Sequence, residues 1–207
     1  MTELRFAIDD ARPKRFAAVP TIAFRLRIET SEPLEALVLR VQLRIEPQWR
    51  DYNAAEKPLL SDLFGTPDRW GTTLRSFSWA DISVTVPAVA DTIAVDVPVP
   101  CTYDFDVAAT RYLNALGGGE VPLRFLFSGA IFRTEDTGFS SERVSWSSEC
   151  AYRMPVQTWR DAMSACYGDD ALVRVKRETL EELHRYRALS GAASWDEVLE
   201  RLLGAPT

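Results

Sequence analysis

Alternating apolar and polar residues near the N-terminus constrain the fold of this chain more than any other feature. In residues 21–30 the large apolar side chains fall at even positions, and Arg25 and Arg27 fall between them. Residues 37–45 repeat the pattern with apolar side chains at every odd position. A period of two with one apolar face is typical of a strand that is half buried in an antiparallel sheet. We expect the two strands to pair as one long hairpin.

Two further segments carry the same alternation. In residues 76–86 the large apolar side chains switch from odd to even positions, which predicts a β-bulge near Ala80 and Asp81. Residues 93–99 alternate again after a short turn, and this arrangement predicts a second hairpin. Because Pro98 has no backbone N–H to donate, we expect the strand over 93–99 to lie at a sheet edge.

The stretch 121–163 is predicted to organise the rest of the fold. Residues 123–132 are apolar at both parities, so we expect a central strand whose two faces are both covered. Gly129 within this strand indicates a bulge or the close approach of another backbone. A shorter strand ending at Trp146 and a helix opening at Pro155 should pack against the central strand.

Helical patterns appear between the strands and dominate the C-terminal part. Asp106 is placed to cap a helix over 107–116, because a short carboxylate can accept hydrogen bonds from the first-turn amides. Ser194 and Glu197 form a capping box for the last helix. The predicted core-facing side chains of the last two helices are Leu180, Leu183, Leu189, Trp195, Val198, Leu199 and Leu202.

These elements predict an α+β fold, mainly an antiparallel β-sandwich or curved sheet with helices at the C-terminal end. We expect residues 1–154 to form the β domain and residues 155–207 to form a helical appendage packed on it. With 207 residues, the chain can bury one substantial core.

Charge and composition disfavour several classes of partner. The formal net charge is −6, so long-range attraction to nucleic acid is not expected. No run of about 20 apolar residues is present, so we expect no membrane insertion. The first ten residues carry three acidic side chains and lack the basic start of a secretory signal. Three widely spaced cysteines argue against a disulfide framework and favour a reducing cytoplasm.

Several segments together resemble a known bacterial family. They are Glu46-Pro47 with Tyr52, Leu63-Phe64-Gly65, Arg69-Trp70, residues 101–106, residues 122–129, and residues 152–156 with Trp159-Arg160. The family has no assigned function, and its genes often lie beside those of nickel-iron uptake hydrogenases. The resemblance implies a link to a hydrogenase and carries no catalytic residue onto this chain.

A second resemblance concerns the order of elements in the C-terminal half. A long hairpin, the strand over 125–132, a helix and then residues 172–186 are similar in order to SecB-type export chaperones. About seventy residues between hairpin and strand depart from that pattern. This resemblance implies a protein that binds unfolded or incompletely assembled chains.

No catalytic constellation is found in the sequence, so we expect no enzyme activity, cofactor or metal. His184 is the single histidine and fits the boundary of an amphipathic helix better than a catalytic role. Cys101 could be a reactive thiol near a helix start, although a free cysteine is more often a small buried residue. Asp104 and Asp106 could offer oxygens to a divalent cation, but capping explains Asp106 without a metal.

The polar face of the predicted first hairpin is the candidate partner-binding surface. It would carry Arg25, Arg27, Arg40 and Arg44 on neighbouring strands. Guanidinium groups on one sheet face suit a protein surface that bears carboxylates. The alternative is a solvated face on which opposite charges pair across strands.

The expected function is that of a non-catalytic accessory or assembly protein in the cytoplasm, associated with a nickel-iron hydrogenase. Its partner would be another protein, and a homo-oligomer is compatible with the sequence. The alternative is a chaperone similar to SecB. A large exposed apolar groove would favour this alternative. A third reading is an enzyme, which a deep pocket with converging titratable groups would favour.

Overall fold

The computed structural model describes residues 3–102, 104, 107–135, 138–168 and 170–204. The chain forms two compact units, residues 1–171 and residues 172–207, called here the sandwich unit and the helical unit.

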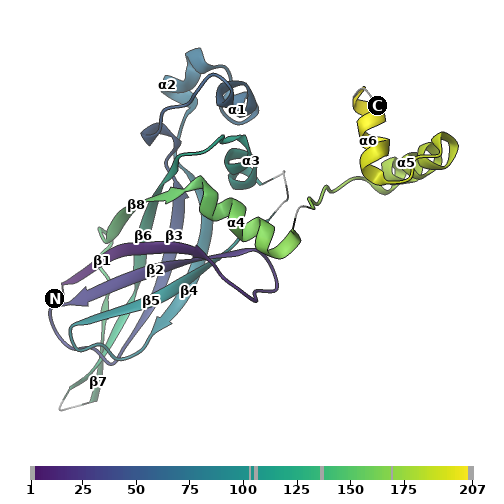
Figure 1. Ribbon diagram of the computed structural model, residues 1–207. Coiled ribbons are helices and arrows are strands. Elements are labelled where there is room, and N and C mark those ends of the chain that lie inside the picture. The colour runs from purple at the N-terminus through teal and green to yellow at the C-terminus, as the bar shows by residue number, and fades with distance from the viewer. Residues whose placement is uncertain (1–2, 103, 105–106, 136–137, 169, 205–207) are drawn as a thin grey trace. The chain divides into compact units, whose positions relative to one another are not determined.

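Among the described residues, eight strands in two antiparallel sheets form the framework of the sandwich unit (Figure 1). The three-stranded sheet has the order β1-β2-β5, with β1 at Leu4–Pro13, β2 at Thr21–Thr30 and β5 at Thr92–Pro100. The five-stranded sheet contains β4 (Phe77–Val86), β3 (Ala36–Ile45), β6 (Glu120–Glu135), β7 (Gly138–Arg143) and β8 (Glu149–Pro155). Strands β7 and β8 both pair with β6, β8 over its first half and β7 over its second. The predicted α+β class with mainly antiparallel sheets is confirmed.

The predicted hairpin of the first two alternating segments is wrong. Strand β2 pairs with β1 and β5, whereas β3 pairs with β4 and β6 in the other sheet. The chain crosses between the sheets over residues 31–35, where Leu34 forms an isolated bridge with Val89. Alternation records which face of a strand is buried, and both strands bury theirs in the same core. It does not record which strand is the hydrogen-bonded neighbour.

The second predicted hairpin is wrong for the same reason, because β4 and β5 belong to different sheets. The bulge in β4 is confirmed. Leu43 pairs with Ala80 and Arg44 pairs with Ser78, so Trp79 is the additional residue. Strand β5, which contains Pro98, lies at an edge of the three-stranded sheet, as predicted.

Strand β6 is central, but only one of its faces is fully covered. Phe125 and Phe127 are buried, whereas Leu126 is only half-buried and Ser128 is exposed. The prediction of two covered faces was therefore wrong for the outer face, which tolerates apolar residues without a covering layer. Gly129 is a close approach, as expected: it has φ +150°, and a Cβ there would lie 2.0 Å from the Val38 carbonyl oxygen.

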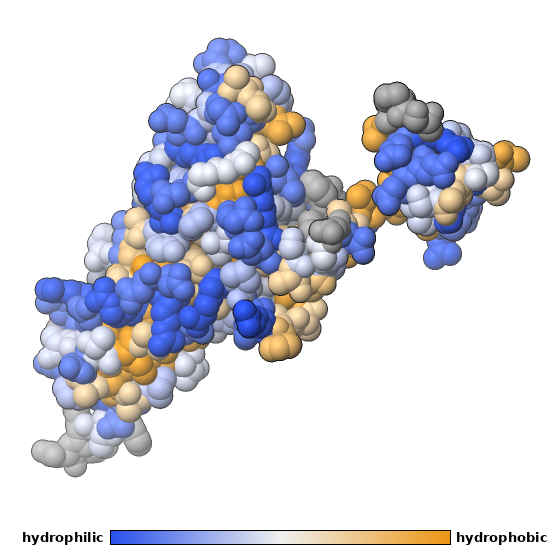
Figure 2. All heavy atoms as spheres, viewed as in Figure 1, coloured by the Kyte–Doolittle hydropathy of each residue, from blue (hydrophilic) through white to orange (hydrophobic). Residues whose placement is uncertain are grey.

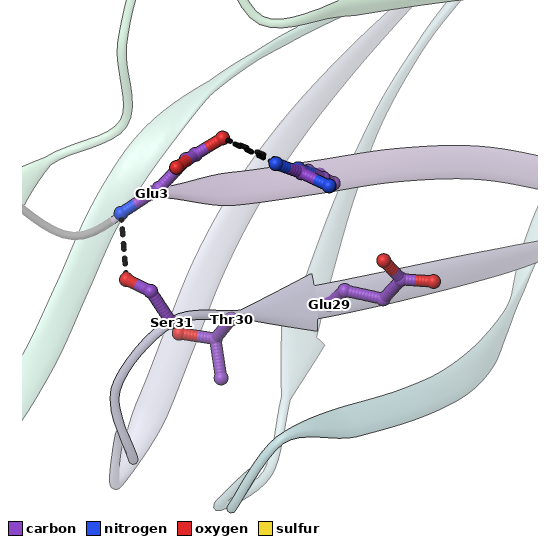
Figure 3. Close-up of a pocket in the computed structure, with 5 residues that line it drawn as sticks. Glu3, Glu29, Thr30 and Ser31 are labelled. Atoms are coloured by element: carbon purple, nitrogen blue, oxygen red, sulfur yellow. Dashed lines mark hydrogen bonds and ion pairs between the residues drawn. The ribbon is translucent and has the colours of Figure 1, made fainter.

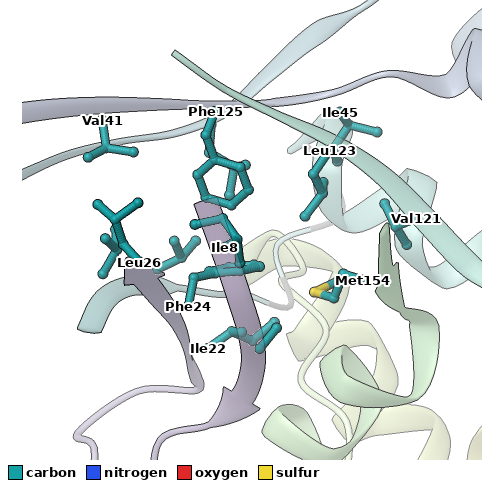
Figure 4. Packing of buried hydrophobic residues seen from close by; sticks show 14 of the residues in the cluster. Ile8, Ile22, Phe24, Leu26, Val41, Ile45, Val121, Leu123, Phe125 and Met154 are labelled. Carbon is teal, nitrogen blue, oxygen red and sulfur yellow. The ribbon is translucent and has the colours of Figure 1, made fainter. Parts of the chain in front are cut away.

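The core lies between the two sheets. Figure 4 shows side chains of both sheets pointing toward one another, with Phe24 and Leu26 facing Phe125 and Val41. The rings of Phe24 and Phe125 meet edge to face with their centroids 5.2 Å apart. Phe6 stacks on Phe127 at 4.2 Å. Aromatic pairs of this kind stabilise the sandwich beyond the effect of area burial alone.

Helices α1 (Glu56–Phe64), α2 (Trp70–Thr73) and α3 (Ala108–Ala115) lie at one end of the sandwich, and β7 extends at the other (Figure 1). Two 3-10 turns, Pro47–Trp49 and Pro67–Arg69, flank α1. Val107 occupies the N-cap position of α3, and the proposed cap Asp106 lies outside the described residues.

Helix α4 (Val156–Tyr167) packs on β1 and β2 within the sandwich unit. The sequence pattern places this helix in the C-terminal appendage, whereas the two compact units divide after residue 171. Pro155 holds the N-cap position rather than the first helical position. The predicted inner stripe is buried at Val156, Trp159 and Met163, whereas Cys166 is exposed. The end of the stripe marks where the helix passes beyond the sheets.

The helical unit contains α5 (Arg177–Ser190) and α6 (Trp195–Leu203). The Ser194 Oγ accepts the Glu197 N–H at 3.1 Å, and the Glu197 carboxylate accepts the Ala193 N–H at 2.7 Å. The capping box is confirmed in its first half, and its return bond reaches one residue earlier than predicted. The predicted core face is confirmed for Val198, which is buried. It is wrong for Leu180, Leu189, Leu199 and Leu202, which are 40%, 90%, 46% and 52% exposed.

Among the described residues, we find no helix with the length and apolar character that crossing a membrane requires.

Candidate functional site

The four arginines predicted to form one face lie on the outer faces of two different sheets. Arg25 and Arg27 belong to β2 in the three-stranded sheet, and Arg40 and Arg44 belong to β3 in the five-stranded sheet. Because the inner faces of the sheets pack together, the two pairs point away from each other. The single arginine face is therefore wrong, and its cause is the mistaken hairpin.

Opposite charges neutralise Arg25 and Arg27 on their own sheet. Arg25 lies 3.3 Å from Asp96, which also binds Arg12 at 3.0 Å. Arg27 pairs with Asp9 at 3.1 Å and with Glu29. Figure 2 shows the resulting band of hydrophilic side chains over β1 and β2. This face is a solvated sheet surface with cross-strand ion pairs, the alternative that the sequence also allows.

Arg40 also has a carboxylate partner. Its Nε and Nη2 donate to the two oxygens of Asp81 at 2.7 and 2.6 Å. These hydrogen bonds hold the pKa of Asp81 below its ordinary value. Both side chains are exposed, so the pair contributes little to stability.

Arg44 differs from the other three arginines because it binds a carboxylate through a serine. Its Nε donates to Ser76 Oγ at 2.8 Å, and its Nη2 donates to the Ser76 carbonyl oxygen at 3.1 Å. The Ser76 hydroxyl in turn donates to Glu46 Oε1 at 3.0 Å. Within the described residues, we find no direct ion pair of Arg44.

A second arginine reaches the same carboxylate from the neighbouring strand. Arg124 on β6 is the register partner of Arg44, and its Nε lies 3.1 Å from Glu46 Oε1. This contact is an ion pair without hydrogen-bond geometry. The Arg124 guanidinium also lies over the ring of Trp49, 4.7 Å from its centroid. We call these five residues, Arg44, Glu46, Trp49, Ser76 and Arg124, the Glu46 cluster.

The end of β3 positions this cluster. The Glu46 N–H donates to the Pro122 carbonyl at 3.0 Å, so Glu46 stays attached to β6 after the strand ends. The 3-10 turn at Pro47–Trp49 then folds over it, and the Trp49 N–H donates to the Glu46 carbonyl at 3.0 Å. Gln48 Nε2 adds a hydrogen bond to Glu46 Oε2 at 2.6 Å.

Within the Glu46 cluster, the carboxylate is buried, whereas the tryptophan and the two arginines are partly exposed. Glu46 is 2% exposed, and burying a carboxylate is costly unless it is paired and hydrogen-bonded. Trp49 is 38% exposed, and Arg44 and Arg124 are only partly buried. The cluster thus presents an aromatic ring and two guanidinium groups, held by a carboxylate beneath them. Arginine and tryptophan so arranged are suited to bind a carboxylate-bearing protein surface.

Sequence reasoning identified Arg44 but missed Trp49, Ser76 and Arg124. Arg124 could have been found, because it is a charged residue inside an otherwise apolar central strand. Ser76 and Trp49 gave no comparable signal, since each reaches the cluster from a loop whose path depends on the sheet pairing.

The other candidates from the sequence, where the structure describes them, are buried or have local partners. His184 packs edge to face on Trp195 at 4.9 Å in the helical unit. Burial raises the pKa of the Cys101 thiol to about 12, which argues against a reactive thiolate. Asp104 has an interaction partner, and Asp106 lies outside the described residues. The described part of the chain contains no group of three or more potential metal ligands among His, Cys, Asp and Glu.

A buried polar network at the helical end of the sandwich has a structural role. Arg50 Nη2 donates to Glu56 at 2.6 Å and to the Gly118 carbonyl at 2.7 Å, and Glu56 accepts the Gly117 N–H at 2.8 Å. These bonds fasten the start of α1 to the loop before β6. The Tyr52 and Tyr112 hydroxyls are 2.8 Å apart, and burial raises the pKa of Tyr112 to about 12.

A small pocket of about 180 Å³ lies where β1 begins and β2 ends (Figure 3). The Glu3 N–H donates to Ser31 Oγ at 3.1 Å, and the Glu3 carboxylate binds Arg5 at 3.1 Å. Glu29 and Thr30 complete the lining. The Glu3–Ser31 hydrogen bond attaches the N-terminal strand to the loop after β2.

Comparisons with known proteins place the chain by its sequence. No curated protein matches it. Among solved structures, beta-glucosidase 3B from Thermotoga neapolitana in complex with alpha-D-glucose shares 12% identity at a TM-score of 0.26. The same enzyme in complex with glycerol shares 10% identity at the same TM-score. Each likeness covers 73% of this chain and 17% of the enzyme, and at such TM-scores it carries no argument. A model described as a family of unknown function, DUF6084, matches residues 1–207, so the chain belongs to that family.

Proposed function

We propose that this chain is a non-catalytic accessory or assembly protein that binds another protein through the Glu46 cluster. The observation that carries the proposal is the pairing of two guanidinium groups and an exposed tryptophan above one buried carboxylate. Because Glu46 and Ser76 already hold the arginines, binding would order few additional side chains. A preordered surface loses less conformational entropy on association than a mobile one.

The proposed setting is the cytoplasm, and the proposed partner is a component of a nickel-iron hydrogenase. This part rests on the resemblance of several segments to a family encoded beside hydrogenase genes. Two of those segments supply the cluster: Glu46-Pro47 contributes the carboxylate, and residues 122–129 contribute Arg124. A protein-binding role would explain why these segments meet at one surface.

A chaperone similar to SecB is the second candidate, and one observation favours it. The helical unit exposes several large apolar side chains, among them Leu189 and Leu203. Such side chains could bind unfolded chains. The two candidates differ in location, because the first depends on the Glu46 cluster and the second on the helical unit.

Affinity purification from the native host, with quantitative mass spectrometry of the recovered proteins, tests the first candidate. The test variant is Trp49→Ala, and the matched control is Arg25→Glu on the outer face of the other sheet. We expect one protein to be enriched with the wild type and the control, and to be depleted with Trp49→Ala. Equal recovery with all three proteins would contradict the proposal, and many unrelated unfolded proteins would favour the chaperone candidate.

A further inference from the structure

A pocket of about 380 Å³ lies next to the Glu46 cluster. Its lining consists of Gln48, Trp70, Gly71, Leu74 and Arg75, and we call it the Trp70 pocket. The 3-10 turn after β3 supplies the glutamine, and α2 with the two residues that follow it supplies the other four. The volume is near the lower limit of the roughly 300 to 1,000 Å³ that ligand pockets have, so it suits a side chain better than a large cofactor.

The apolar wall of the pocket is held in place by the surrounding fold. The Trp70 indole N–H donates to the Gly65 carbonyl at 2.9 Å, and the ring meets Tyr52 edge to face with centroids 5.3 Å apart. The Leu74 N–H donates to the Trp70 carbonyl at 3.0 Å. Trp70 and Leu74 are both half-buried and pack against the core of the sandwich. A preformed wall of this kind is where an anchor side chain of a protein partner inserts.

Arg75 brings a positive charge to the pocket. Its Nε donates to the Thr72 carbonyl at 2.9 Å, which restrains the guanidinium group. Within the described residues Arg75 forms no ion pair, and none of the residues that line the pocket is acidic. A carboxylate bound there would supply the counter-ion, with the short, charge-assisted hydrogen bonds that guanidinium groups form.

Gln48 adds a hydrogen-bond acceptor whose orientation the Glu46 cluster determines. Its Nε2 donates to Glu46 Oε2 at 2.6 Å. Because the carboxylate accepts this bond, the amide nitrogen of Gln48 must face Glu46, and Oε1 is the atom that Gln48 offers to the pocket. An amide oxygen at an exposed position can accept a backbone N–H of a bound peptide.

Two residues connect the pocket to the Glu46 cluster. Gln48 lines the pocket and binds Glu46. Arg75 lines the pocket and directly precedes Ser76, whose hydroxyl donates to Glu46. An occupant that contacts both the pocket and the cluster must therefore be longer than one small molecule, and a peptide segment meets this requirement.

The charges around the pocket favour an acidic segment. Arg44, Arg75 and Arg124 bring three guanidinium groups to the pocket and the cluster. Among the described residues, the carboxylates in direct contact with them are Glu46 and Glu149, both at Arg124. A segment that bears carboxylates complements this surface, although the formal charge of the whole chain is −6.

We propose that the Trp70 pocket is the anchor site for an acidic peptide segment of the protein partner. One apolar side chain of that segment lies against Trp70 and Leu74, a neighbouring carboxylate of the segment binds Arg75, and Gln48 Oε1 accepts a backbone N–H. The proposal rests on the proposed function, because the Glu46 cluster binds the same partner beside the pocket. It adds the chemistry that the partner must carry and the side chains that recognise it.

NMR titration of the full ¹⁵N-labelled chain tests the pocket without the natural partner. The probe is the acetylated and amidated peptide Asp-Glu-Leu-Glu-Asp. The chain has six tryptophans, and the indole N–H signal of Trp70 is the one that disappears in Trp70→Phe. We expect the probe to shift this signal with half-saturation on the order of 1 mM. The peptide Asp-Glu-Ser-Glu-Asp, which keeps the charge and lacks the apolar side chain, should bind about tenfold more weakly.

Charge reversal provides the matched comparison. Arg75→Glu places a carboxylate where the proposal requires a cation and should weaken probe binding about tenfold or more. Arg69→Glu makes the same charge change at an exposed side chain that does not line the pocket, and it should weaken binding no more than about twofold. An unmoved Trp70 signal, equal binding of both peptides or equal weakening by both variants would overturn the proposal.

Recovery of the partner from the native host separates this proposal from the proposed function. If both hold, Arg75→Glu and Trp49→Ala each deplete the partner, whereas Arg69→Glu recovers it as the wild type does. A partner lost with Trp49→Ala but recovered with Arg75→Glu contradicts the pocket alone. A partner lost with Arg75→Glu but recovered with Trp49→Ala contradicts the Glu46 cluster alone, and full recovery with both variants contradicts both proposals.

Discussion

Arg44 and Arg124 lie directly opposite each other on β3 and β6, and Glu46 contacts Arg124 directly and Arg44 through the Ser76 hydroxyl. Like charges at opposed positions of a sheet repel, and the Glu46 carboxylate, together with Glu149 at 3.8 Å from Arg124, offsets this repulsion. Ser76 carries the interaction from Arg44 to Glu46, and Arg124 reaches the carboxylate directly. The protein thus keeps two cations at one exposed sheet face by burying an anion at its edge.

Replacing Glu46 tests this dependence through stability. Glu46→Ala leaves two guanidinium groups without their shared anion, and breaking a buried ion pair typically costs about 3 to 5 kcal/mol. We expect a loss toward the lower end of that range, because both arginines are partly solvated. The measurement is urea unfolding followed by tryptophan fluorescence. Asp81→Ala, which removes the exposed partner of Arg40, is the control and should cost no more than about 1 kcal/mol. Equal losses in the two variants would contradict the assigned role of Glu46.

The two faces of β6 should respond differently to truncation. Phe127→Ala removes a buried ring that stacks on Phe6 and should cost about 3 to 5 kcal/mol. Leu126→Ala, at the next position on the half-buried outer face, should cost clearly less. Urea unfolding of both variants checks the difference. A loss below about 1 kcal/mol for Phe127→Ala would show that the ring does not belong to the core.

Gly129 should not tolerate a side chain. A Cβ at this position would overlap the Val38 carbonyl oxygen at 2.0 Å, and the backbone has φ +150°. Gly129→Ala should therefore destabilise the sandwich by more than about 1 kcal/mol and separate β3 from β6 locally. Hydrogen exchange at the amides of both strands would detect this separation. The matched variant Gly71→Ala, with no atom near the new Cβ, should leave exchange in these strands unchanged.

Cysteine reactivity should follow burial. Burial raises the pKa of the Cys101 and Cys150 thiols to about 12, so almost no thiolate is present near pH 8. We expect iodoacetamide to modify the exposed Cys166 and to leave the other two unmodified in the native protein. Peptide mass spectrometry after brief labelling checks this pattern, with urea-unfolded protein as the control in which all three react. Rapid native labelling of Cys101, or a native disulfide in non-reducing peptide maps, would contradict it.

The sequence predicted individual strands well and their pairing poorly. The alternation in residues 21–30 and 37–45 predicted β2 and β3 and their buried faces. Burial of one face of a strand requires apolar residues at every second position, and this pattern is visible in the local sequence. The pattern does not identify the hydrogen-bonded neighbour of a strand, so it predicts a hairpin turn at residues 31–35, where the chain instead crosses between the sheets. The switch of apolar side chains from odd to even positions near Ala80 did predict the bulge. One additional residue moves every later side chain to the opposite face of the strand.

The mistaken hairpin also made the predicted partner-binding surface wrong. Four arginines were expected on one face, yet Arg25 and Arg27 lie on the opposite side of the sandwich from Arg40 and Arg44. Arg124 joins Arg44 only because β6 is the neighbour of β3, a relation that sequence periodicity does not contain. Trp49 reaches the cluster through a 3-10 turn that Pro47 begins, and its N–H donates to the Glu46 carbonyl oxygen.

The affinity of the purified protein for the partner recovered from the host tests the central claim most directly. Isothermal titration calorimetry would compare the wild type, Trp49→Ala and Arg25→Glu at low salt. If the Glu46 cluster is the binding surface, Trp49→Ala should raise the dissociation constant roughly thirtyfold. This change corresponds to about 2 kcal/mol, a typical value for a hot-spot residue. Arg25→Glu should change it less than about twofold, because that arginine lies on the other sheet. A dissociation constant that Trp49→Ala leaves unchanged, or that Arg25→Glu raises by the same factor, would contradict the account.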